Sequence, residues 1–239
     1  MLETTTDEIA DNIFRLSTFV PDANIMFNQF VARGDESLLF HTGPRALFPL
    51  VSAAVARVVP LDQLRWITFG HVEADECGAM NHFLATAPNA QVAHGAIACM
   101  VQVNDLADRE PRPLADDDIV DLGGLRVRSI DTPHIPHGWD AHVVYEETTR
   151  TLFCGDLFTR FGESPATTSD DIVEAAITME SFGAPTALTP STAPMIRRLA
   201  DLDVDTLALM HGPTYQGDCN KALLELADGY AHMLAVALP

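Results

Sequence analysis

Three side chains that can bind a metal ion lie at alternate positions in one short stretch, from Gly70 to Gly78. They are His71, Glu73 and Asp75. The stretch follows a strand-like run, 64–69, and precedes a helix-like run, 79–87. Because alternate side chains of an extended backbone point to the same side, we expect the imidazole and the two carboxylates to converge. Taken alone, the stretch fits an acidic, solvated loop as well as it fits a metal site.

Three further metal-binding side chains each follow a separate predicted strand, next to a glycine or a proline. They are His134, Asp156 and His211. Binding sites of layered α/β folds gather at strand ends, so the sequence predicts that all these donors share one pocket. The set is too large for one tetrahedral zinc ion, and it suits two cations about 3.5–4 Å apart with a bridging carboxylate. The expected metal ligands are His71, Glu73, Asp75, His134, Asp156 and His211.

The order of these residues, His-x-Glu-x-Asp followed by His, Asp and His, resembles the metallo-β-lactamase superfamily. Most hydrolases of that superfamily have His-x-His-x-Asp-His, and Glu73 replaces the second histidine here. With that replacement the chain is similar to the β-lactamase-like domain of flavodiiron proteins and of the related oxygen-binding di-iron proteins. The resemblance implies an α/β fold, a four-layer αββα sandwich with the metals at one edge, formed by residues 1–239 as a single domain.

The resemblance also implies which residues hold each ion. One iron would be held by His71, Glu73 and His134. A second would be held by Asp75 and His211, with Asp156 as the bridge. The carboxylates expected to act in catalysis would be Asp75 and Asp156. Because a carboxylate oxygen is a harder ligand than an imidazole, Glu73 favours iron or manganese over zinc, and zinc stays an alternative.

Two departures from the family pattern bear on the chemistry. The residue after Asp75 is Glu76, where the superfamily usually has histidine, and Glu76 could be solvated, could support a ligand, or could be a ligand itself. Flavodiiron proteins also carry a flavodoxin domain after the β-lactamase domain, whereas this chain ends at Pro239 and has no phosphate-binding flavin loop. We therefore expect no FMN within the chain and electrons from a separate redox protein.

Two other residues are candidates for a supporting role around the ligands. His137 lies three positions after His134, in a loop that must line the pocket, and could support a ligand, face the substrate or be structural. Tyr215 could form part of the pocket wall or of the core. Both stay open on the sequence alone.

The composition excludes several classes of partner. The net charge is −20, from 14 Lys and Arg against 34 Asp and Glu, so the chain lacks the basic surface that nucleic acids and anionic membranes need. No apolar run reaches the roughly 20 residues that cross a bilayer, and the acidic N-terminus is no secretory signal. We expect a cytoplasmic protein whose partner is a diatomic ligand or a small molecule. The family resemblance suggests a homodimer.

Apolar periodicity and turn residues predict the regular elements. Strands are expected at 13–20, 25–32, 38–40, 64–69, 91–93, 119–122, 125–130, 142–145, 151–154 and 204–210. Helices are expected at 46–59, 79–87, 96–106, 172–182, 193–202 and 219–238. The proline- and aspartate-rich segment 109–118 is expected to be an exposed loop.

Three functions fit these observations. The first is a non-heme di-iron protein that binds O2, or that reduces O2 or NO with electrons from an external donor. The alternative is a binuclear hydrolase of an ester, lactone or phosphodiester, in which Asp75 orients a metal-bridging hydroxide. A third is a sensor whose oxygen occupancy changes its contact with a signalling partner. Whether the protein is an enzyme is left open by the sequence.

Overall fold

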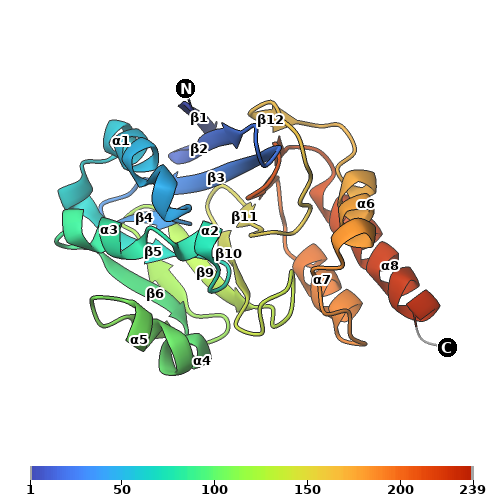
Figure 1. The fold of residues 1–239 in the computed structure, drawn as a ribbon. Coiled ribbons are helices and arrows are strands. Elements are labelled where there is room, and N and C mark those ends of the chain that lie inside the picture. Colours follow the sequence, from blue (N-terminus) through green and yellow to red (C-terminus); the bar gives the residue numbers. More distant parts are fainter. Residues whose placement is uncertain (1, 238–239) are drawn as a thin grey trace.

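Two seven-stranded sheets form the centre of the protein in a computed structural model that describes residues 2–237 (Figure 1). Across the first sheet the strands are β1 (Thr4–Ala10), β2 (Ile13–Val20), β3 (Ile25–Ala32), β4 (Ser37–Phe40), β5 (Leu64–Thr68), β6 (Gln91–Gly95) and β7 (Arg112–Leu114). Across the second they are β12 (Thr167–Thr168), β14 (Thr214–Tyr215), β13 (Thr206–Ala208), β11 (Thr151–Phe153), β10 (His142–Glu146), β9 (Arg126–Asp131) and β8 (Ile119–Asp121).

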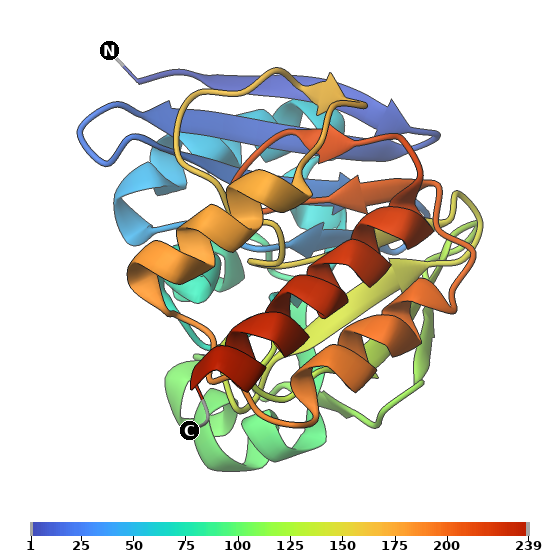
Figure 2. The same ribbon diagram turned by 90° about the vertical axis from the view of Figure 1, so that its right-hand side faces the viewer.

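Helices cover the outer face of each sheet. On the first sheet they are α1 (Phe48–Val58), α2 (Ala74–Cys77), α3 (Met80–Thr86), α4 (Ala96–Ala98) and α5 (Asn104–Leu106), with short 3-10 turns at Arg45–Leu47 and Leu61–Gln63. On the second they are α6 (Val173–Gly183), α7 (Thr192–Ala200) and α8 (Cys219–Ala237), which lie across the sheet in Figure 2. This is the four-layer αββα sandwich that the resemblance implied.

Alternation along the strands separates three cores. In β4, Leu39 packs toward α1 and α3, whereas its neighbours Leu38 and Phe40 point into the space between the sheets. In β10, Val144 points into the same space and Val143 packs toward the outer helices. Because both faces of each sheet are covered, these strands are apolar on both sides. The sandwich therefore follows from the alternation of the strand residues.

Most predicted elements are confirmed, and the exceptions have physical reasons. The segment 109–118, expected to be a loop, contains β7, whose Pro113 is tolerated because β7 is the last strand of its sheet. The predicted helix 96–106 is helical but is interrupted by a π-helical turn at Cys99–Val103. The short strands β1, β12 and β14 were not predicted. β1 pairs with the next strand in the sequence, β2, whereas β12 and β14 have two residues each and pair with each other across a long stretch of sequence, Thr167 with Thr214.

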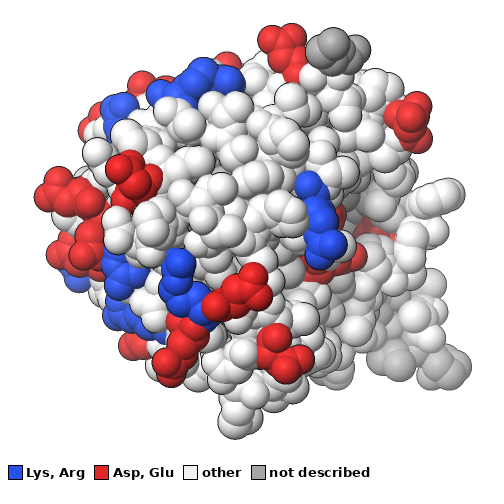
Figure 3. All heavy atoms as spheres, turned by 60° about the vertical axis from the view of Figure 1, so that its left-hand side comes forward, with Lys and Arg blue, Asp and Glu red and all other residues white. Residues whose placement is uncertain are grey.

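The surface mixes charges of both signs. On the face shown in Figure 3 the basic side chains lie beside acidic ones around a broad uncharged centre, so this face has no separate basic patch. Between residues 2 and 237, no helix combines the length and apolar character that a bilayer crossing requires.

The aromatic cluster between the sheets should dominate the stability of the sandwich. Phe153 is fully buried and contacts the rings of Phe30 and Phe40, with ring centroids 5.6 and 5.3 Å away. We expect Phe153→Ala to lower the free energy of unfolding by about 3–5 kcal/mol, measured by denaturant titration. Phe182→Ala is the matched control, because its ring is 82% exposed and its loss should have little effect. Equal losses in both variants would contradict this description of the core.

Candidate metal centre

The first two donors lie in the bend between β5 and α2, where the N–H of Glu73 donates to the carbonyl of His71. Glu73 has φ −137° and ψ 154°, and its Oε2 lies 2.8 Å from Nε2 of His71. The extended conformation ends there, because α2 begins at Ala74. The expectation that Asp75 continues the same extended run is therefore wrong. The backbone N–H groups of Glu76 and Cys77 donate to the Glu73 carbonyl and close a helical turn.

The helical turn gives Asp75 a different direction from Glu73. Acidic residues are favoured in the first turn of a helix, where the backbone N–H groups are unpaired, and α2 has Asp75 and Glu76 there. Asp75 consequently faces His211, whose Nε2 lies 3.3 Å from its Oδ2. Three donors that are close in the sequence thus divide between two halves of the site.

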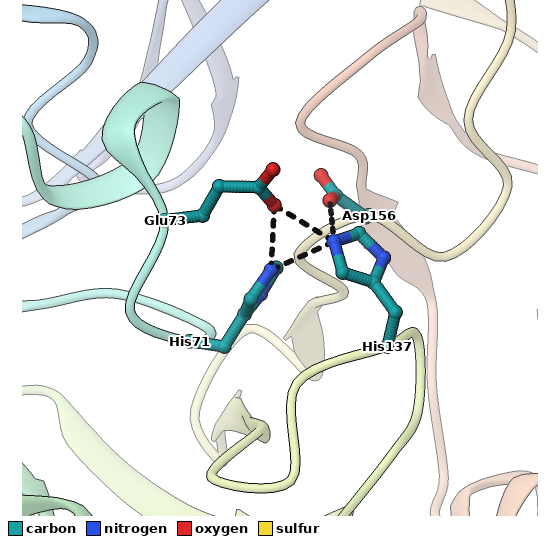
Figure 4. A group of neighbouring side chains, drawn as sticks. All are labelled: His71, Glu73, His137 and Asp156. Atoms are coloured by element: carbon teal, nitrogen blue, oxygen red, sulfur yellow. Dashed lines mark hydrogen bonds and ion pairs between the residues drawn. The ribbon is translucent and has the colours of Figure 1, made fainter. Parts of the chain in front are cut away.

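The loop after β9 delivers His137 to the cluster, and not His134. Nε2 of His137 lies 2.8 Å from Nε2 of His71 and 2.7 Å from Oε2 of Glu73 (Figure 4). The side chain of His134 is exposed, and its backbone has φ 67°. The structure therefore corrects the expected ligand: His137 takes the place that the sequence suggested for His134.

Local hydrogen bonds explain why the loop turns His134 outward. The N–H of His134 donates to the carbonyl of Gly138, and that of Ile135 donates to Thr132. Gly138 packs directly on His71, since a Cβ at this position would lie 2.7 Å from the Cβ of His71. This close approach brings the adjacent His137 to the cluster. The sequence signal was His137-Gly138, which pairs a donor with a residue that allows tight packing.

Asp156 connects the two halves of the site. It follows β11 through Gly155, which has φ 55°. Its Oδ2 lies 3.5 Å from Nε2 of His137, and its Oδ1 lies 3.3 Å from Nε2 of His211. One oxygen therefore faces each half, which is the arrangement of a bridging carboxylate.

The first sheet holds the His211 loop in place. Nδ1 of His211 lies 2.7 Å from the carbonyl of Met26 on β3, and a carbonyl only accepts, so Nδ1 carries the proton. Nε2 is then free to bind a metal. The side chains of Asn28 and Arg15 donate to the Gly212 carbonyl and fix the same loop. Strands of the first sheet therefore position a donor that follows a strand of the second.

The donor set fits two metal ions. Ligand atoms of His71, Glu73, His137 and Asp156 all lie within 4.8 Å of one another. The spacing of the closest ones resembles that of neighbouring ligands around an ion with bonds of about 2.1 Å, which lie roughly 3 Å apart. Oδ1 of Asp75 and Oδ1 of Asp156 are buried and have no hydrogen-bond partner within residues 2–237. A pair of ions would satisfy these atoms.

Two buried imidazoles of the cluster, those of His71 and His211, are strongly basic in this setting. Burial alone would lower the pKa of His71, but attraction to Glu76 and hydrogen bonds to Glu73 and Glu76 raise it to about 11. Burial also disfavours the charged form of His211, and attraction to Asp156 raises its pKa to about 10. Without a metal, both rings are therefore protonated at neutral pH.

The carboxylates show the complementary effect. Hydrogen bonds from His137 and His71 hold the pKa of Glu73 well below its usual range. Burial would raise the pKa of Asp156, but attraction to His211 lowers it to about 2. The site thus keeps Glu73 and Asp156 ionised, and protonated imidazoles occupy the place where cations would bind.

A small pocket opens onto this cluster. Its volume is about 140 Å³. Metal-binding donors form one wall, and the opposite wall comes from α6, the loop after it and α8. The residues of that opposite wall are Ala176, Met179, Glu180, Pro185, Thr186 and Tyr230.

Of the residues that the sequence suggested as supports for the ligands, Glu76 contacts the cluster and Tyr215 does not. Glu76 is buried behind His71 and contacts it. Tyr215 lies in the core under α8 and is absent from the lining of this pocket, so the structure supports the core alternative.

His41 was missed, although it follows β4 as the other donors follow their strands. It is fully buried, has φ 65°, and its Nε2 lies 3.5 Å from Oε2 of Glu76.

Comparisons with known proteins agree with the geometry. The family model described as "ODP family beta lactamase" matches residues 25–212. "Putative diflavin flavoprotein A 2" of Synechocystis sp. is 25% identical over 200 residues, which cover 80% of this chain and 33% of that protein. This chain therefore spans about a third of the length of that relative.

Solved structures share the fold over nearly the whole chain. The rubredoxin oxygen:oxidoreductase of Desulfovibrio gigas superposes with a TM-score of 0.82 at 14% identity, covering 95% of this chain and 62% of that one. A fragment, residues 1–254, of "putative diflavin flavoprotein A 5" from Nostoc sp. PCC 7120 superposes with a TM-score of 0.80 at 17% identity. That alignment covers 99% of this chain and 97% of the fragment.

The two histidines of the 132–141 loop give a direct test of the ligand set. We expect His137→Ala to reduce the bound metal from about two ions per chain to about one, because one half of the site loses an imidazole. His134→Ala is the matched control and should keep the full metal content. Metal content is measured by inductively coupled plasma mass spectrometry after dialysis. Loss of metal in His134→Ala alone would contradict the placement of the loop.

Metal binding should release protons in a way that depends on pH. At pH 8, binding should displace about two to three protons per chain, because His71, His211 and the protonated fraction of His137 must become neutral to coordinate. Calorimetric titration in buffers of different ionisation enthalpy measures this number. The released number should fall as the pH approaches 10, the pKa of His211. Binding at pH 8 without proton release would contradict the raised pKa values.

The metal-free protein should lose stability as the pH rises. The folded-state pKa values of His71 and His211 exceed the ordinary 6.5, so their ion pairs stabilise the fold fully below pH 6.5 and are lost toward pH 10 to 11. Denaturant titrations of the metal-free protein across this range measure the effect. Stability that increases over the same interval would have the wrong sign.

Proposed function

Because the chain belongs to the ODP family of β-lactamase-fold proteins, we propose that it is a binuclear non-heme iron protein that binds O2 or NO and reduces it with electrons from a separate donor. The observation that carries this proposal is the bridging position of Asp156 between two groups of donors. The homodimer and the cytoplasmic location inferred from the sequence stay predictions.

The residues around the bridge would divide the metal binding as follows. His71, Glu73 and His137 would hold one ion, and Asp75 and His211 the other. A pair of iron ions would supply two reducing equivalents and open positions for a diatomic ligand. The side chains fix the spacing of the two positions and keep the imidazoles oriented. Three carboxylates among the ligands favour a hard cation, which supports iron or manganese over zinc.

The size of the pocket supports a small ligand. Its volume of about 140 Å³ is well below the roughly 300–1,000 Å³ of sites that enclose drug-sized molecules. Liquid water occupies about 30 Å³ per molecule, so the pocket has room for a diatomic ligand and a few waters. Met179 and Pro185 contribute apolar surface to its wall. Such a pocket suits O2 or NO better than a bulky ester or lactone.

The relatives support redox chemistry over the hydrolase that the sequence left open. One carries the name rubredoxin oxygen:oxidoreductase, and the others are named as diflavin flavoproteins. The aligned region covers 62% of the first of these chains. The source of electrons is proposed to be a separate redox protein, and the name rubredoxin oxygen:oxidoreductase of one relative supports this choice.

Anaerobic reconstitution with ferrous iron tests the proposal. We expect about two iron ions per chain, and consumption of O2 or NO when a chemical reductant is supplied. Asp156→Ala should lose iron and this activity, since both halves of the site share Asp156. His134→Ala should retain both, because its side chain lies outside the cluster. Iron-loaded protein that consumes neither gas, or that hydrolyses esters instead, would refute the proposal.

A further inference from the structure

A fully buried carboxylate lies directly behind the metal ligand His71. The Glu76 side chain is 0% exposed, and its Oε2 accepts a hydrogen bond of 2.6 Å from the backbone N–H of His71. Its Oε1 lies 3.1 Å from Nδ1 of the same histidine. The two oxygens of one carboxylate therefore contact the backbone and the ring of one residue. Nε2, at the opposite side of the ring, faces Glu73 and His137.

The surrounding backbone leaves room for this carboxylate. A Cβ on Gly70 would lie 3.0 and 3.1 Å from its two oxygens, and a Cβ on Gly155 would lie 3.6 Å from Oε1. His41 lies on the other side, 3.5 Å from Oε2. Both glycines belong to loops that deliver metal-binding donors, so the position of Glu76 is built into the site.

We infer that Glu76 is a positioning residue of the metal centre, which fixes the ring of His71 with the proton on Nδ1 and Nε2 directed at the metal. The inference rests on the proposed metal-binding function. A histidine ligand whose other nitrogen donates to a carboxylate has a defined tautomer and orientation and is a stronger ligand. At the place where related hydrolases have a histidine, this chain has a residue that supports a neighbouring ligand.

The two histidines His71 and His211 have different partners at Nδ1. Nδ1 of His211 donates to the neutral carbonyl of Met26, whereas Nδ1 of His71 lies 3.1 Å from Oε1 of the Glu76 carboxyl group. Only the half with His71 therefore has a carboxyl group directly behind its imidazole ring. We expect that half to bind a divalent cation more tightly, and we expect Glu76 to account for the difference.

Zinc binding and nuclear magnetic resonance of the ring nitrogens test this role without redox chemistry. In zinc-loaded wild-type protein, His71 should show a protonated Nδ1 with a slowly exchanging, downfield proton. Glu76→Gln should weaken binding of the tighter zinc ion roughly 10–100-fold and shift that proton signal, because the amide can accept only one of the two hydrogen bonds. Zinc affinity is measured by competition with a chelator.

Glu146→Gln is the matched control. Glu146 is also 0% exposed and accepts hydrogen bonds from backbone N–H groups, among them those of Thr148 and Thr149 in the turn after β10. Its replacement should reduce stability and leave zinc affinity unchanged. Zinc affinity of Glu76→Gln within twofold of wild type, with the His71 signal unchanged, would overturn the inference.

Two further outcomes keep the test decisive. If Glu76→Gln does not fold, the wild-type spectrum decides, because an unprotonated Nδ1 on zinc-bound His71 overturns the inference by itself. Failure of the iron-loaded protein to consume O2 or NO would refute the proposed function. The zinc affinities and the His71 proton signal would still test the role of Glu76. The two proposals can therefore fail separately.

Discussion

Mutual repulsion among closely spaced carboxylates is the constraint on which the rest of the site depends. Glu73, Asp75, Glu76 and Asp156 meet at one edge of the sandwich, and two of them are almost fully buried. Unit charges 4 Å apart interact by about 4 kcal/mol at an effective dielectric constant of 20, so such a group needs compensating positive charge. Protonated imidazoles supply it in the free protein, and two divalent cations would supply it in the metal-bound protein.

The fold was predictable because its signals are local, whereas the ligand set was only partly so. Local patterns were enough to indicate strands such as Ile25–Ala32, and the family resemblance carried by the order of the donors implied the sandwich and the edge that holds the site. The choice between His134 and His137 was not predictable in this way, because it depends on Gly138 packing against His71 from another sheet. Tertiary contacts of this kind leave no periodic pattern in the sequence.

The direction predicted for the Asp75 side chain was wrong because a local pattern does not distinguish two backbone conformations. A short stretch with donors at alternate positions reads equally well as extended chain or as the start of a helix, and the acidic residues that suggest metal binding also favour the first turn of a helix. The helical turn proves chemically useful, because it directs Glu73 and Asp75 to different partners. The structure brings His71, Glu73 and Asp75 to the same cluster, but the direction that sequence periodicity predicted for Asp75 was wrong.

His71 and Glu73 come from loops of the first sheet, whereas His137, Asp156 and His211 come from loops of the second. A bound ion would consequently act as a cross-link between the two layers of the sandwich. Its binding energy would be shared with the contacts that hold the layers together, since a ligand that binds only the folded state stabilises that state. Loading the centre and closing the sandwich would then be a single coupled equilibrium.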